Sequence, residues 1–192
     1  MSASRRDRIL CIVICGAGPA SRVHVLVEMA QRDGWTVRIV ATPAATAFLD
    51  TEALAELCGS PVRTDYRSNG ESSQRSSAAG SIIVAPATFN SINKLAAGVN
   101  DTYALNVVAE AIGRNAPVAI LPFVNTALAS RRPFQHAVET LRVEGVRVIM
   151  GPGEWLPHPP GTGDSRLEDY PWHLPLAAIE ETAHQSRTHR RG

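Results

Sequence analysis

The chain has 192 residues, of which 44% are hydrophobic and 19% are charged. This composition is typical of a single folded domain with a sizeable core, and it excludes a disordered chain. Its 19 basic and 18 acidic side chains leave a formal net charge of +1, so no net field favours binding to nucleic acid or to an anionic membrane.

The N-terminal sequence MSASRRDR precedes an apolar run, residues 9–15, that stops at Gly16 without a small-residue cleavage site. We therefore expect a basic arm that leads into a first strand, rather than a secretion signal. No stretch approaches the roughly 18 apolar residues of a membrane span. Cys11 and Cys15 lie within the apolar run without metal-ligand spacing. They predict buried thiols, no metal site and a cytoplasmic protein.

Strands and helices alternate along residues 9–150. After the first strand, a glycine turn precedes a helical pattern at 20–33, a strand at 36–41 and a further helix that Pro43 opens. Next come strands at 81–85, 118–121 and 146–150 and helices at 89–97, 101–113 and 132–144, with Asn100 or Asp101 as the cap of the helix at 101–113. This alternation predicts one α/β domain with a Rossmann-like, doubly wound parallel sheet.

Two segments depart from this pattern. Residues 60–80 are rich in serine and glycine and predict a surface loop. After a domain spanning 1–150, residues 151–192 form a proline-rich region that predicts an irregular arm with a frayed end from residue 185. Because Trp155, Tyr170 and Trp172 are too apolar for a free tail, we expect the arm to pack over a site or a neighbouring subunit.

Ligands of a doubly wound sheet bind beyond the carboxyl ends of its strands. The segments 16–21, 42–44, 86–91 and 122–126 follow such ends, and they are rich in Gly, Ser, Thr and Asn without a cluster of Lys or Arg. Backbone amides and hydroxyl groups of this kind suit a single phosphate monoester. The first segment, GAGPAS, falls short of the dinucleotide fingerprint because Ser21 stands at the third glycine position.

Motifs in these segments resemble a known family. APATFNS at 85–91 is similar to the motif APASANT, and LPFVNTAL at 121–128 is similar to P-x-M-N-x-x-M, of the homo-oligomeric flavin-containing cysteine decarboxylases. The likeness covers most of residues 9–150 and implies an FMN-binding flavoprotein domain there. It also implies a homotrimer or a multiple of three, and a small thiol or a cysteine-terminated peptide as the substrate of an oxidative decarboxylation.

The resemblance implies roles for individual residues. Asn125 would contact the substrate carboxylate. The residues that would hold the phosphate and ribityl chain of FMN are Gly16, Ala17, Gly18, Thr42, Thr88, Phe89, Asn90 and Ser91.

The sequence also departs from the family. Ser72 stands at the position of the catalytic histidine, and serine does not take up a proton near neutral pH as imidazole does. The glycine-rich stretch after the last strand lacks the cysteine found in pantothenate-pathway members. His158 is the first candidate for a replacement base, whereas His24 and His136 are better explained as helix-surface residues. Two alternatives therefore stay open, a flavin prenyltransferase-like enzyme and a non-catalytic assembly partner of an active homologue.

Overall fold

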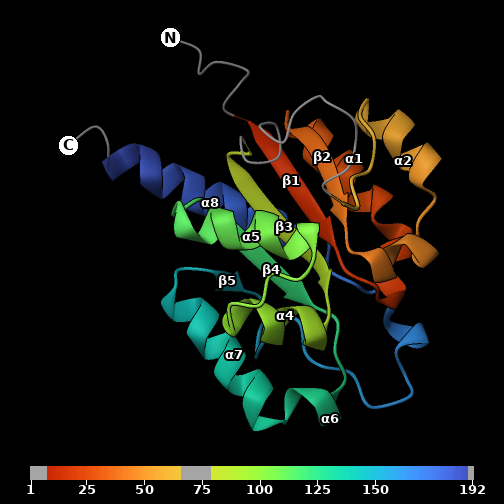
Figure 1. The fold of residues 1–192 in the computed structure, drawn as a ribbon, viewed down its shortest axis with the longest axis vertical. Helices are drawn as coiled ribbons and strands as arrows, with labels where there is room; N and C mark the ends of the chain where they lie inside the picture. Colours follow the sequence, from red (N-terminus) through yellow and green to blue (C-terminus); the bar gives the residue numbers. More distant parts are fainter. Residues whose placement is uncertain (1–7, 66–78, 190–192) are drawn as a thin grey trace.

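The computed structural model describes residues 8–65 and 79–189, and its centre is a five-stranded parallel sheet (Figure 1). The strand order is β2-β1-β3-β4-β5, and every neighbouring pair is parallel. This is the predicted α/β, Rossmann-like fold. The strands are β1 Ile9–Ile14, β2 Thr36–Ala41, β3 Ser81–Ala87, β4 Val118–Pro122 and β5 Arg147–Val148.

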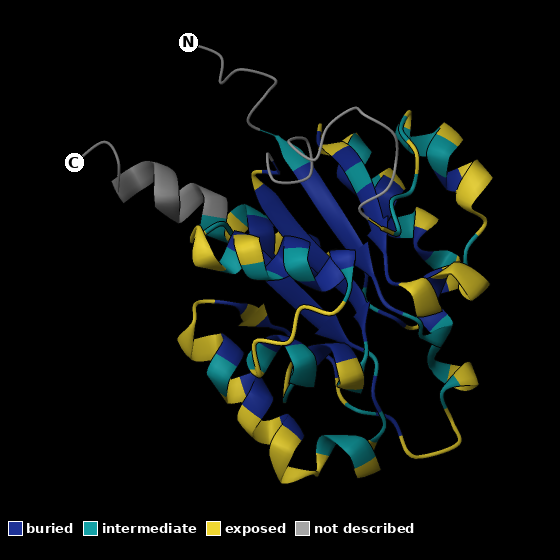
Figure 2. Ribbon diagram, viewed as in Figure 1, coloured by how far each residue is buried: buried dark blue, intermediate teal, exposed yellow. Residues whose placement is uncertain are grey.

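The sheet is buried on both faces because helices cover both (Figure 2). Successive side chains of β1 alternate between the two cores: Leu10 and Ile12 pack on one face, and Cys11 and Val13 pack on the other. The first face is covered by α1 His24–Arg32, α2 Thr51–Cys58 and α8 His173–His189, and the second by α4 Phe89–Ala96, α5 Tyr103–Gly113 and α7 Arg132–Val143.

Several boundaries differ from those the sequence predicts. The helix expected at 20–33 begins as the 3-10 helix η2 Gly18–Arg22, and the helix expected from residue 42 is the 3-10 helix η3 Pro43–Phe48. A new N-cap, Asp50, then starts α2. The cap of α5 is Thr102, not Asn100 or Asp101, because its side chain accepts the hydrogen bond from the Leu105 amide. The last strand is limited to β5, whereas β3 continues to Ala87.

The C-terminal region packs on its own chain. Tyr170 lies edge-on between Trp155 and Trp172, with ring centroids 5.5 and 4.7 Å apart, and all three rings are buried in the core. Apart from the short 3-10 helix η4 Asp164–Arg166, residues 151–172 are irregular, as expected. The expectation is wrong from His173 onward, where α8 forms and places Leu176 and Ile179 in the core.

Most of the predicted surface loop at 60–80 lies outside the described residues. Its beginning instead extends the sheet, because the backbone of Arg63 pairs with Ile39 and Ala41 beside β2. Within the residues that the structure describes, no helix is long and apolar enough to cross a membrane.

Candidate functional site

A cavity of about 590 Å³ lies where the loops after β1, β2, β3 and β4 meet. Its volume falls within the range of roughly 300–1,000 Å³ that is typical of small-molecule sites. The parallel topology brings these loops to one edge of the sheet although they are far apart in the chain. The cavity is lined by Gly16, Ala17, Thr42, Pro43, Ala44, Thr88, Phe89, Asn90, Ser91, Lys94, Thr102, Leu105, Phe123 and Leu128.

Two glycines of the turn after β1 have different roles. At Gly16, an added Cβ would lie only 2.7 Å from the backbone oxygen of Ala44, so this turn and η3 approach as closely as they do because residue 16 has no side chain. At Gly18, an added Cβ would lie 2.7 Å from Cδ2 of Leu167 in the C-terminal arm. Gly16 therefore shapes the cavity, whereas Gly18 makes room for the arm.

Thr42, directly after β2, supplies a polar group that has no partner within the described part of the chain. The residue is 7% exposed, and its Oγ1 atom is buried without a hydrogen bond among the described residues. Burying an unpaired hydroxyl costs about 1–3 kcal/mol. Because Thr42 lines the cavity, a ligand that bonds to this hydroxyl would remove that cost.

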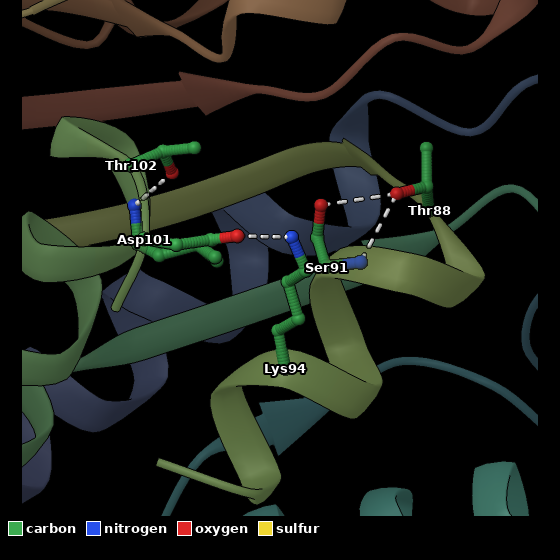
Figure 3. A network of polar contacts seen from close by, with 6 residues as sticks. Thr88, Ser91, Lys94, Asp101 and Thr102 are labelled. Carbon is green, nitrogen blue, oxygen red and sulfur yellow. Dashed lines mark hydrogen bonds and ion pairs between the residues drawn. The ribbon is translucent and has the colours of Figure 1, made fainter. Parts of the chain in front are cut away.

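The N-terminus of α4 lines the cavity, and Figure 3 shows how Thr88 and Ser91 lie there. Oγ1 of Thr88 accepts a hydrogen bond from the backbone amide of Ser91 at 3.2 Å and lies 3.0 Å from its hydroxyl. Helix N-termini favour anions because their first amides have no partner within the helix. Beneath this turn, burial raises the pKa of the Cys15 thiol, and hydrogen bonding by Ser91 and Thr88 opposes the rise. At neutral pH Cys15 is therefore an uncharged packing group.

Lys94 lines the same wall, but its charge is compensated. Its Nζ atom forms an ion pair with Asp101, and Thr102 beside that carboxylate caps α5 (Figure 3). The cavity can thus attract a single phosphate through amides and hydroxyls without a cluster of unpaired lysines. Among the described residues, no group of three or more His, Cys, Asp or Glu side chains is placed to hold a metal ion.

The loop after β4 places Asn125 beside His158. The Asn125 amide oxygen accepts a hydrogen bond from the backbone of Leu128 at 2.9 Å and so caps the one-turn helix α6 Thr126–Ala129. His158 pairs with this loop through its backbone, because its carbonyl accepts from Thr126 at 2.8 Å. Its buried ring packs at 4.8 Å from Phe123, which lines the cavity.

The structure brings most of the predicted cofactor-binding residues together at the cavity. Three other residues predicted for the site lie outside its lining. The cavity lining includes the predicted residues Gly16, Ala17, Thr42, Thr88, Phe89, Asn90 and Ser91. Gly18, Asn125 and His158 do not line it: the first packs against the arm, the second caps α6 and the ring of the third packs on Phe123.

Among the described residues, the cavity lining contains neither the position of the family histidine nor another candidate histidine. Ser72 lies outside the part of the chain that the structure describes. His24 and His136 are exposed on α1 and α7 and do not line the cavity.

Sequence reasoning missed part of the lining. Lys94 lies one helical turn after Ser91, and this spacing could have revealed it, since residues three apart share a helix face. Phe123 and Leu128 belong to the motif at 121–128 but carry no polar group that would single them out. Thr102 and Leu105 belong to the cavity lining because α5 begins beside α4.

Comparison with known proteins gives the family. The family model described as Flavoprotein matches residues 2–170. The chain belongs to the Flavoprotein family. This flavoprotein is 29% identical over 144 residues to the coenzyme A biosynthesis bifunctional protein CoaBC of Thermococcus kodakarensis, with 73% of this chain and 36% of the relative covered. The chain thus spans about a third of the length of the curated relatives it matches.

Solved structures of two FMN-dependent cysteine decarboxylases, SpaF and TvaF, and of the peptidyl-cysteine decarboxylase EpiD have the same fold. SpaF is 26% identical with a TM-score of 0.65, covering 76% of this chain and 85% of SpaF. TvaF from thioviridamide biosynthesis is 20% identical with a TM-score of 0.69, covering 90% of this chain and 98% of TvaF. A variant of EpiD in complex with the substrate peptide DSYTC is 22% identical with a TM-score of 0.63, covering 73% of this chain and 79% of EpiD.

The residues of the cavity fit an FMN group. The unpartnered Thr42 hydroxyl, the N-terminus of α4 and the close backbone approach at Gly16 suit its single phosphate. Apolar side chains of Leu105, Phe123 and Leu128 suit a flat aromatic ring system.

Proposed function

We propose that this flavoprotein binds FMN in the cavity beyond β1–β4 and decarboxylates a cysteine-derived molecule or a peptide with a C-terminal cysteine. The observation that carries the proposal is the buried Thr42 hydroxyl, which has no hydrogen-bond partner among the described residues and lines the same cavity as the N-terminus of α4. Family membership and the likeness to FMN-dependent cysteine decarboxylases support it. EpiD, which shares the fold, takes a peptide that ends in cysteine.

Each part of the cavity has a role in this proposal. Bound FMN supplies a two-electron oxidation of the thiol-bearing carbon, after which the neighbouring carboxylate leaves as CO₂. Thr42, Thr88 and Ser91 hold the phosphate, while Phe123 and Leu128 keep water from the ring. By the family resemblance the active assembly is a homotrimer or a multiple of three, so that a neighbouring subunit closes the open side of the cavity.

The test is flavin binding by the purified protein, followed as quenching of FMN fluorescence and as a visible spectrum. We expect the protein to bind FMN and Thr42→Val to weaken binding about tenfold, because one charge-assisted hydrogen bond is lost. Thr46→Val is the matched control, since the Thr46 hydroxyl donates to Pro43 at 2.7 Å and lies outside the cavity. A protein that neither carries nor binds FMN would contradict the proposal.

A second candidate is a non-catalytic FMN-binding assembly partner. It is favoured by Ser72, which stands where the related decarboxylases carry their catalytic histidine. Mass spectrometry of a cysteine-terminated peptide separates the two, because oxidative decarboxylation removes CO₂ and two hydrogens. Turnover by the wild type supports the enzyme. Turnover only in Ser72→His, or in neither protein, supports the assembly partner.

A further inference from the structure

A second hollow lies between α1 and α2, apart from the cavity beyond β1–β4. Its volume is about 310 Å³, at the lower end of the range of roughly 300–1,000 Å³ for small-molecule sites. Beside it, the side-chain amide of Gln31 in α1 donates to the carbonyl of Leu57 in α2 at 2.8 Å and joins the two helices. We call this hollow the groove, and it is lined by Ala20, Ser21, Val23, His24, Glu28, Leu49, Asp50, Ala53, Leu54 and Leu57.

The groove combines an apolar floor with an acidic rim. Val23 and Leu54 are buried, whereas the carboxylate residues Glu28 and Asp50 are exposed. No lysine or arginine is among the described residues that line the groove. Its lining therefore carries a net negative charge, even when His24 is protonated.

Both carboxylates can accept further hydrogen bonds. Oδ1 of Asp50 accepts from the Ala53 amide at 3.0 Å, but a carboxylate has about four acceptor positions. The ion pairs between described residues involve neither Glu28 nor Asp50. Lysine and arginine side chains lay an apolar stem along apolar surface and hold a cation at its edge. Such a side chain matches the groove in both polarity and charge.

The 3-10 helix η3 connects the groove with the cavity. Pro43 and Ala44, at its start, line the cavity, whereas Leu49 and Asp50, directly after its end, line the groove. Its surface between the two is open to solvent, and Phe48 is 41% exposed. Because a 3-10 helix rises about 2 Å per residue, the two linings lie about 10 Å apart along it. An extended peptide covers this length with roughly three residues.

We infer that the groove binds a lysine or arginine side chain of the substrate peptide, three to five residues before its terminal cysteine. The terminal residue then lies in the cavity while the chain before it follows η3. The acidic rim favours a basic residue, and the span of η3 sets its position. The inference rests on the proposed function and adds a sequence preference to its peptide substrate.

The experiment measures peptide affinities by calorimetry with the FMN-loaded protein and again without FMN. Each peptide ends in serine in place of cysteine, so that no thiol is oxidised, and carries one lysine at a chosen distance from this end. Matched peptides carry norleucine, which has a similar stem without the charge. We expect lysine to strengthen binding about fivefold at three to five residues before the end and to have little effect elsewhere. The gain should shrink at high salt.

Two variants and a control assign this gain to the groove. Glu28→Gln should remove most of it. Asp50→Asn should reduce it as well, while asparagine keeps an N-cap at the start of α2. Glu56→Gln is the matched control, because Glu56 is an exposed acid of α2 that does not line the groove and the change in net charge is the same. It should leave the gain unchanged.

The results separate this inference from the proposed function. A lysine gain that is equal at all positions, or that survives Glu28→Gln, would overturn the inference. So would binding of N-acetyl-lysine amide as tight as that of the best peptide, because the groove would then hold a free amine. If FMN binds and no lysine gain is found, only the inference is overturned. If no FMN binds but Glu28→Gln removes the gain, the proposed function is contradicted and the peptide groove is supported.

Discussion

Burial sets the acidity of the thiols in β1. Burial raises the pKa of Cys11 from 9.0 to about 12, and the charge of Arg38 opposes this rise. Cys11 is completely buried on β1 between β2 and β3, so its ionised form would lose its hydration. The thiol therefore stays neutral in the folded protein at physiological pH.

This shift predicts a loss of stability in alkali. Because the folded pKa of Cys11 lies above the unfolded value of 9.0, its contribution to stability is complete below pH 9 and is lost as the pH rises toward about 12. The loss amounts to about 1.4 kcal/mol for each pH unit above 9. In urea unfolding at several pH values, the difference between wild type and Cys11→Ala should shrink at this rate, and an unchanged difference would contradict the assignment.

At the scale of elements, α2 and α4 each begin at a polar N-cap residue, and the type of residue does not show which of the two caps lies at the cavity. Oδ1 of Asp50 accepts from the Ala53 amide at 3.0 Å at the start of α2, and Oγ1 of Thr88 accepts from Ser91 at the start of α4. Both are ordinary N-caps. They differ in that Thr88 lines the cavity and Asp50 does not.

Removing each cap separates helix stability from ligand binding. Asp50→Ala and Thr88→Ala should each lower the free energy of unfolding by about 1 kcal/mol, because each leaves a helix-terminal amide without its acceptor. Only Thr88→Ala should also weaken FMN binding, measured by fluorescence titration. Equal FMN affinities of the two variants would remove Thr88 from the ligand site.

At the scale of the whole molecule, the C-terminal arm joins parts of the chain that are distant in sequence. The buried hydroxyl of Tyr170 donates to the carbonyl of Leu121 in β4 at 2.6 Å. Burial, and secondarily Cys15, raises the pKa of Tyr170 well above its usual value, so the hydroxyl keeps the proton that it donates. Glu168 forms an ion pair with Arg22 at the end of η2.

Tyr170→Phe should loosen the arm. The variant loses one buried hydrogen bond, which costs about 1–2 kcal/mol, and trypsin should then cleave faster at Arg166 in the arm. Tyr103→Phe serves as a control, because its hydroxyl accepts from Arg63 at 3.3 Å, away from the arm. Cleavage at the same rate in wild type and Tyr170→Phe would show that the aromatic packing alone holds the arm.

Sequence patterns were sufficient to predict the parallel α/β architecture and the four loops that form the site. Apolar runs with the strand period, separated by helical patterns, allow few other solutions, and parallel strands end at one edge. Gly16, Thr42 and Thr88 could therefore be placed near one another without coordinates. The surface loop expected at 60–80 stays a prediction over most of its length, because residues 66–78 lie outside the described structure.

Which loop residues face the cavity depends on tertiary contacts that the sequence pattern does not show. Gly18 and Gly16 stand two positions apart in one motif, yet Leu167 of the distant arm covers the first and leaves the second at the cavity. Asn125 became a helix cap beside His158, while Lys94 and Thr102 entered the lining from neighbouring helices. The direction of a loop side chain depends on contacts between segments far apart in the chain, and local periodicity carries no record of those contacts.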